Sequence, residues 1–188
     1  MWSRIFGIVL AAATLAYPAV VYLGMESRNL HWVAVSLVAM AVLRALTSRG
    51  WVWVAVALGA MTLALGSTLS QSWMPLKLYP VLVNLVLLAV FGLSLISGPP
   101  VIESLARLTE PELPATAIPY TRKVTQVWCG FFVINASLAA ATALWASDAV
   151  WALYNGLLAY GLMGLLFSAE WLMRRRVRYR DALDAAHG

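Results

Sequence analysis

The sequence contains little charge, and its 188 residues include a single cysteine. Only 11% of the residues are charged, whereas a soluble domain of this size carries about 25%. The lone Cys129 excludes an internal disulfide and a cysteine-based metal site, so we expect it to pack as a small apolar residue. The scarcity of charge argues against an ordinary soluble domain, because long uncharged runs would cover its surface with hydrocarbon.

The usual signatures of catalysis are also missing. There is no Gly-x-Ser-x-Gly elbow, no Walker phosphate-binding loop and no His-Glu-x-x-His motif. His31 and His187 are far apart in the chain, and no Asp follows His31 at the spacing of a His-x4-Asp acyltransferase. The sequence therefore predicts no metal site, no cofactor and no catalytic triad.

Apolar residues dominate instead: 62% of the chain is hydrophobic and the mean hydropathy is +0.81. A helix needs about 20 apolar residues to cross a bilayer, with a range of roughly 17–25. An all-α membrane protein with one transmembrane domain is therefore predicted. Its six predicted spans are Ile5–Leu23, Leu30–Leu46, Val52–Leu69, Leu76–Ile96, Val124–Trp145 and Val150–Phe167.

The first span also has some features of a signal peptide, with Arg4 ahead of it and small residues around Pro18. Because the apolar run continues to Leu23 without a clear cleavage site, we interpret it as an uncleaved anchor.

The distribution of basic residues predicts the orientation of these spans, because cytoplasmic segments carry an excess of lysine and arginine. If both termini and the loop 97–123 are cytoplasmic, eleven of the thirteen basic residues lie inside and only Arg28 and Lys77 lie outside. The basic tail 172–188 is expected to contact anionic membrane lipids rather than nucleic acid. Its arginines are Arg174, Arg175, Arg176, Arg178 and Arg180.

The nine tryptophans give a second indication, because indole prefers the interface between headgroups and hydrocarbon. All lie near predicted span ends, so we expect them to act as interfacial anchors. The cytoplasmic set is Trp2, Trp51, Trp53, Trp128 and Trp171, and the outer set is Trp32, Trp73, Trp145 and Trp151.

The composition of the long loop 97–123 is explained least by contact with the membrane. After Pro99 and Pro100, the stretch Val101–Thr109 is expected to form a short interfacial helix in which Glu103 and Arg107 pair at i,i+4.

Three further prolines are expected to keep Glu110–Tyr120 extended. The charged residues of the loop are candidates for binding a soluble partner, although a plain connector with solvated charges explains them as well. These candidates are Glu103, Arg107, Glu110, Glu112, Arg122 and Lys123.

Polar side chains within the spans form a second candidate group. Asn84, Asn135, Tyr154 and Asn155 fall in the last three spans, where an amide must find a partner. Either they join helices by hydrogen bonds, at about 0.6–2 kcal/mol each, or they line a path for a ligand. Glu170, at the end of the last span, is expected to form a helix-end salt bridge with one of the cations at a similar depth, Arg122, Lys123 or Arg174.

Several segments carry a family resemblance: Gly98–Leu108, Glu110–Pro114, Tyr120–Thr125 and Trp151–Gly156. Together they resemble a family of uncharacterised bacterial inner-membrane proteins, over about Tyr79 to Arg176. Genes of that family accompany type II fatty-acid-like and aryl-polyene pathways. The resemblance implies a bacterial inner-membrane location and a partner such as an acyl carrier protein or an acyltransferase. It implies no catalytic residues.

Three functions remain open at this point. The first is a non-enzymatic scaffold that recruits soluble components of a lipid or polyene pathway through the loop and the basic tail. The second is a subunit of a small lipid transporter or flippase, which would work as a homo-oligomer because six short spans offer little material for a path. The third is a membrane-embedded transferase with Glu103, Glu110 or Glu112 as a base, which lacks an accompanying nucleophile.

The orientation can be tested with topology reporters. Fusions after Arg180 and within Pro111–Pro114 should report cytoplasm, whereas fusions near Met25 and Ser72 should report the outer side, because of the charge asymmetry. A signal from the outer side for the Pro111–Pro114 fusion would overturn the six-span topology.

Overall fold

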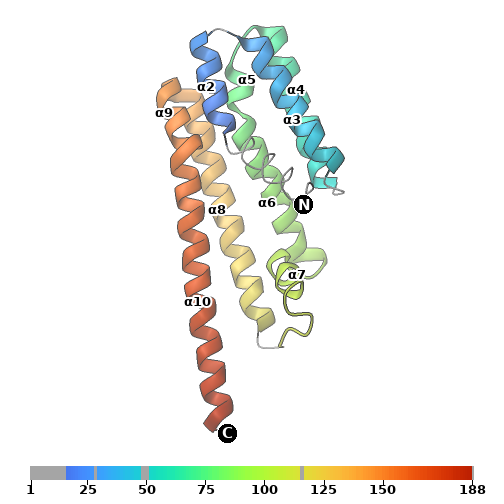
Figure 1. Ribbon diagram of the computed structural model, residues 1–188, viewed down its shortest axis with the longest axis vertical. Coiled ribbons are helices and arrows are strands. Elements are labelled where there is room, and N and C mark those ends of the chain that lie inside the picture. The colour runs from blue at the N-terminus through green and yellow to red at the C-terminus, as the bar shows by residue number, and fades with distance from the viewer. Residues whose placement is uncertain (1–15, 28, 48–50, 115–116, 188) are drawn as a thin grey trace, which may run out of the picture.

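The computed structural model describes residues 16–27, 29–47, 51–114 and 117–187, and within these ranges all regular structure is helical. Most helices run along the long axis of an elongated bundle (Figure 1). Their bounds are α2 Tyr17–Ser27, α3 Leu30–Thr47, α4 Trp51–Ser70, α5 Met74–Lys77, α6 Tyr79–Ser97, α7 Val101–Arg107, α8 Ala117–Trp145, α9 Asp148–Leu153, the π-helix η1 Tyr154–Leu158 and α10 Ala159–His187.

Within the described ranges, four helical stretches are long and apolar enough to cross a membrane: Val52–Ser70, Met74–Ser97, Ala117–Trp145 and Asp148–Arg175. A shorter apolar helix covers Leu30–Leu46. The expectation of an all-α, multi-pass membrane protein is thus confirmed. The predicted span Ile5–Leu23 is described only over α2, and its first part, with Arg4, lies outside the described residues. The count of six spans remains a prediction.

The helices alternate in direction between two ends of the bundle (Figure 1). The end that we call the α5 end carries α5, the end of α4 and the Ala146–Ser147 turn before α9. The opposite end, the α7 end, carries α7 and the start of α8, and α10 extends beyond it. A chain that crosses a bilayer repeatedly must alternate in direction. Each crossing is helical, because the backbone polar groups in hydrocarbon must be paired within a helix.

At the α5 end, α4 stops at a left-handed residue. Gln71 has a φ of 51°, and the N–H of Ser72 donates to the carbonyl of Ser67 at 3.1 Å. This is the hydrogen bond of a Schellman motif, which satisfies a carbonyl that the helix leaves unpaired. The reversal brings α5 back over the bundle and places Lys77 against α9.

Two sets of packed side chains hold the bundle. Near the α5 end, residues of α2, α3 and α4 surround Leu76, Tyr79 and Trp151. Near the α7 end, Trp128 is 4% exposed and lies at the centre of an aromatic cluster. The ring centroids of its neighbours lie 4.5–6.5 Å away, in Phe91, Phe131, Phe132 and Phe167. This cluster joins α6, α8 and α10.

The tryptophans fall into two groups by exposure. Trp32, Trp145 and Trp171 are exposed, as suits an indole at the interface. Trp128 and Trp151 are buried against neighbouring helices, and the interfacial depth of all nine stays a prediction. Both buried tryptophans lie near span ends, and that position does not distinguish an indole that faces lipid from one that faces a neighbouring helix.

The extended segment Glu110–Tyr120 was also predicted wrongly in its last part. α8 begins at Ala117, so Pro119 and Tyr120 are helical. Proline is tolerated in the first turn of a helix, because the N–H that it lacks has no intrahelical partner there. α8 and α10 both extend past their predicted cytoplasmic boundaries at Val124 and Phe167, since a helix continues through the interface where long cationic side chains reach water.

The aromatic cluster should dominate the stability of the bundle near the α7 end. Replacing Trp128 by alanine removes contacts with four rings, and we expect it to lower the free energy of unfolding by about 3 kcal/mol. The measurement is the melting temperature in detergent. Trp145→Ala is the matched control, because Trp145 is 82% exposed and should tolerate the change. Equal melting temperatures for the two variants would contradict this account of the core.

Candidate functional site

The helix predicted within the loop exists as α7, and its charged pair holds it together. The Nε and Nη2 atoms of Arg107 donate to Oε1 of Glu103 at 3.0 and 2.8 Å. The Glu103 side chain is only 7% exposed, whereas Leu105 and Leu108 are largely exposed. The helix therefore turns its carboxylate toward the protein and its leucines outward. A buried carboxylate requires such a partner, so Glu103 and Arg107 are structural residues.

Two further contacts fix the loop to α6, one from the start of α7 and one from the start of α8. The N–H of Val101 donates to Oγ of Ser94 at 3.1 Å, and Nη2 of Arg122 donates to the carbonyl of Leu95 at 2.9 Å. The last carbonyls of a helix lack intrahelical partners and carry partial negative charge. Arg122 thus caps α6 from the start of α8.

The rest of the loop is tied to α10. Arg174 Nη2 lies 3.8 Å from Glu110 Oε2, and the Tyr120 hydroxyl donates to the carbonyl of Glu170 at 3.3 Å. Because the Arg174 and Glu110 side chains are 37% and 44% exposed, this ion pair contributes only about 0–1 kcal/mol. Among the described residues Arg174 pairs with Glu110, and Glu170 forms no ion pair. The salt bridge predicted for Glu170 was therefore wrong.

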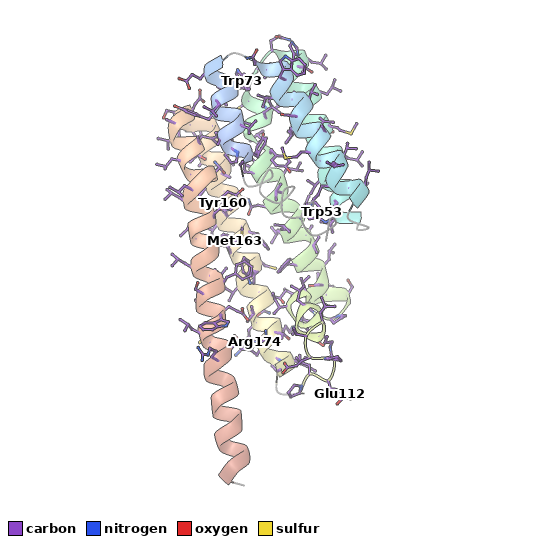
Figure 2. The ribbon with its side chains drawn as sticks, viewed as in Figure 1. Trp53, Trp73, Glu112, Tyr160, Met163 and Arg174 are labelled. Carbon is purple, nitrogen blue, oxygen red and sulfur yellow. The ribbon has the colours of Figure 1, made fainter. Side chains whose placement is uncertain are left out.

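A pocket of about 260 Å³ lies between α7, the loop, α8 and α10. In Figure 2, Arg174 on α10 is level with the first turns of α8, and Glu112 lies on the loop at the α7 end. The pocket combines apolar and charged walls, from Ile102, Ala106, Leu113, Tyr120, Glu110, Glu170 and Arg174, among others.

The remaining charges at this end point outward. The side chains of Lys123 and Glu112 are exposed, and they make no hydrogen bond or ion pair with the described part of the chain. Arg175 is exposed, and its guanidinium lies 4.7 Å from the centroid of the Trp171 ring. Of the six predicted partner-binding residues, Glu103, Arg107, Glu110 and Arg122 make contacts that hold the loop in place, although Arg107 and Arg122 are themselves exposed. The side chains of Glu112 and Lys123 are exposed and make no such contact with the described residues.

Three of the four predicted intramembrane polar residues form one network. Asn135 Nδ2 donates to Asn84 Oδ1 at 3.1 Å, and the Tyr154 hydroxyl donates to Asn135 Oδ1 at 2.7 Å. Asn84 Nδ2 in turn donates to the carbonyl of Pro80 at 2.8 Å. The network links α6, α8 and η1, as the prediction of interhelical hydrogen bonds requires.

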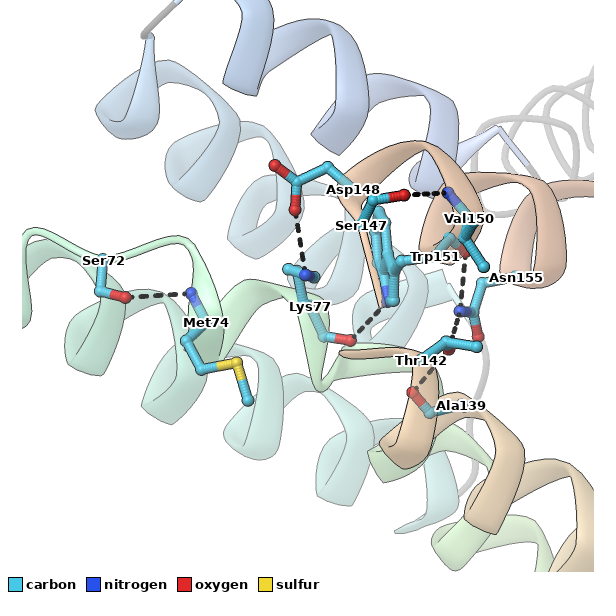
Figure 3. A network of polar contacts seen from close by, with 10 residues as sticks. All are labelled: Ser72, Met74, Lys77, Ala139, Thr142, Ser147, Asp148, Val150, Trp151 and Asn155. Carbon is cyan, nitrogen blue, oxygen red and sulfur yellow. Dashed lines mark hydrogen bonds and ion pairs between the residues drawn. The ribbon is translucent and has the colours of Figure 1, made fainter. Parts of the chain in front are cut away.

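Asn155 lies apart from this network, in the π-helix η1. Its Nδ2 donates to the carbonyl of Trp151 at 2.9 Å and to Oγ1 of Thr142 at 3.3 Å (Figure 3). A π-helical turn inserts one residue into an α-helix and disturbs the regular hydrogen bonds. The Asn155 amide supplies a donor to one of the carbonyls next to this insertion.

A cavity of about 80 Å³ adjoins both groups of amides. It is large enough to hold water, which needs only about 10–15 Å³ of such volume. None of the described residues that line it is charged, and the polar ones among them are Tyr17, Tyr79, Asn84, Asn135, Asn155 and Tyr160.

A polar site at the α5 end was missed from the sequence. Lys77 Nζ lies 3.0 Å from Asp148 Oδ1, and the Trp151 indole N–H donates to the carbonyl of Lys77 at 3.1 Å (Figure 3). The Lys77 side chain is 9% exposed and that of Asp148 is 55% exposed. One signal was present, because the predicted topology places these opposite charges at the same outer end.

The described residues offer no metal site, since no group of three or more His, Cys, Asp or Glu side chains among them could hold a metal ion.

The role of the amide network can be tested at Asn135. Asn135→Leu removes two hydrogen bonds and leaves the Asn84 oxygen and the Tyr154 hydroxyl without that partner, so detergent stability should fall by about 1–2 kcal/mol while insertion is unchanged. Ser137→Leu, an exposed change on the same helix, is the control. Loss of function in cells at an unchanged melting temperature would instead favour the ligand-path interpretation.

Comparison of the chain with known proteins found no matching family model, no matching curated protein and no matching solved structure, so its function has to be argued from these sites.

Proposed function

We propose that this protein is a non-enzymatic membrane scaffold that docks an acidic soluble partner at its α7 end. In this proposal the chain crosses a bacterial inner membrane six times, with both termini and the α7 end in the cytoplasm. The partner is a soluble component of a lipid or polyene pathway, such as an acyl carrier protein or an acyltransferase. The pathway and the location follow from the family resemblance.

The observation that carries the proposal is the buried carboxylate of Glu103, which is paired with the more exposed Arg107. A loop that merely connects two spans needs no inward carboxylate, because solvated charges would serve it equally well. Here α7 is held by this pair and by the N–H of Val101, which donates to Ser94 of α6, while the cap from Arg122 and the contact of Glu110 with Arg174 hold the rest of the loop. A segment fixed in this way loses little conformational entropy when a partner binds, which favours a docking surface.

Charge supports an acidic partner. Within the described loop, Glu103 and Glu110 are already paired with arginines, whereas Lys123 and Arg175 are exposed. Further arginines, at 176, 178 and 180, continue along α10. An excess of positive charge at a membrane surface speeds association with an acidic protein.

The two alternatives are less well supported. The amides within the membrane bond mainly to one another and to backbone, and the cavity beside them is small for a transported lipid. For a transferase, Glu103 is buried against Arg107, so it is poorly placed to act as a base. Neither observation affects the scaffold proposal.

The proposal is tested by reversing the exposed charges. Arg107 and Arg122 are unsuitable targets because both hold the loop. We expect Lys123→Glu combined with Arg175→Glu to reduce partner recovery from membranes several-fold at low salt, at an unchanged membrane level. The matched control is Lys123→Arg with Arg175→Lys, which keeps both charges.

Recovery by the parent protein should also weaken as ionic strength rises, because exposed charges are screened beyond about 8 Å at 0.15 M salt. If the charge-reversed protein complements a deletion fully and recovers the same soluble proteins as the control, the α7 end is only a connector.

A further inference from the structure

The 80 Å³ cavity beside the amides lies between the two sets of packed side chains that hold the bundle. Of its lining residues, Tyr17 and Tyr79 belong to the set near the α5 end. Leu87 and Met163, which also line it, pack against the aromatic cluster near the α7 end. In Figure 2, Tyr160 and Met163 mark its level on α10, about halfway along the bundle. The cavity is thus far from both ends of the bundle.

One amide at this cavity has an acceptor that the protein does not use. Both hydrogens of Asn155 Nδ2 are donated, to the carbonyl of Trp151 and to Oγ1 of Thr142. No donor among the described residues reaches Asn155 Oδ1, although the residue is only 4% exposed. An amide oxygen within a membrane needs a donor. Because Asn155 lines the cavity, that donor has to come from the cavity.

Two phenols at the cavity are in a similar position. The hydroxyls of Tyr79 and Tyr160 form no hydrogen bond with the described part of the chain, and Tyr79 is 7% exposed. The Tyr17 hydroxyl differs, because it donates to the carbonyl of Leu76. A buried tyrosine hydroxyl usually finds a partner, and it can both donate and accept. The cavity therefore needs a ligand that donates and accepts hydrogen bonds within a small volume.

We infer that the cavity binds a small cluster of water molecules. Water donates to the Asn155 oxygen and accepts from a tyrosine hydroxyl, and a buried water makes about three such bonds. Cavities that stay empty are apolar, whereas this one is lined by three amides and three phenols. The water joins Asn155 to Asn84 and Asn135, which line the same cavity, so that one network links α6, α8 and η1.

A hydrated cavity also explains how a π-helix with a polar side chain persists at this depth. The inserted residue disturbs the regular hydrogen bonds of the helix, and bulk solvent does not reach hydrocarbon to replace them. Bound water supplies the partner that Asn155 lacks. The inference goes beyond the scaffold proposal and does not depend on it.

The asparagines make the test specific, because the chain has only four of them. Three line the cavity, and the fourth, Asn29, is exposed at the α5 end of the bundle. The full chain is labelled with ¹⁵N-asparagine and placed in bilayers of deuterated phosphatidylcholine. Solid-state NMR then measures the transfer of magnetisation from water to each side-chain amide. We expect transfer to the amides of Asn84, Asn135 and Asn155 as well as to Asn29, which is the internal reference.

Filling the cavity with carbon should remove the water. Ala159 is 6% exposed and lines the cavity, so Ala159→Leu places an apolar side chain there. We expect loss of transfer to the three buried amides and unchanged transfer to Asn29. Ala159→Val adds less volume and is the second variant. Ala169→Leu is the matched control, because Ala169 is exposed on the same helix and does not line the cavity.

Two outcomes would overturn the inference. One is the absence of transfer to the three buried amides in the parent protein while Asn29 gives a signal, which would show a dry cavity. This measurement needs no substitution, so it decides the question even if a variant fails to fold. The other is full transfer to the buried amides in an Ala159 variant that keeps the parent melting temperature, which would place the water outside this cavity.

Discussion

The absence of water from the bilayer core is the constraint on which the structure depends. A backbone or side-chain polar group at that depth must find its partner within the protein. Helices satisfy the backbone, and the amides of Asn84, Asn135 and Asn155 bond to one another, to a hydroxyl or to a carbonyl. Many of the described charged residues lie at the two ends, among them Lys77 and Asp148 at the α5 end and Glu103, Arg107 and Arg174 at the α7 end. Each end therefore has its own polar organisation, and these two organisations hold the short elements α5, α7 and α9 in place.

At each end, one buried ion is matched by a more exposed partner. At the α5 end the buried ion is the Lys77 ammonium, paired with the exposed Asp148; at the α7 end it is the Glu103 carboxylate, paired with Arg107. Removing the exposed partner would leave a buried charge, which costs far more than the pair itself contributes. These pairs fix the geometry of the connections more than they add to stability, and at the α7 end that geometry creates the pocket.

Much of the fold follows from hydropathy, because α3, α4 and α6 begin and end within a few residues of the predicted spans. The i,i+4 pairing of Glu103 with Arg107 was also predictable, since helical spacing alone brings them together. What could not be predicted is the direction in which particular side chains point. The sequence does not say that Glu103 faces inward, that Trp128 faces other helices, or that Arg174 reaches Glu110 across the loop. These side-chain directions depend on how each helix is rotated about its own axis. Hydropathy does not specify that rotation, because it is nearly uniform around each helix.

The π-helix η1 sets that rotation for α10. Downstream of it, one stripe faces the bundle at alternating spacings of three and four residues, through Tyr160, Met163, Phe167, Glu170 and Arg174. Three of these side chains, Tyr160, Met163 and Arg174, can be followed down α10 in Figure 2. An inserted residue turns everything after it by about 100° relative to a regular α-helix. The extra residue near Asn155 thus works as a phase shift, so that an irregularity near the α5 end decides which side chains of α10 face the pocket at the α7 end, several turns away.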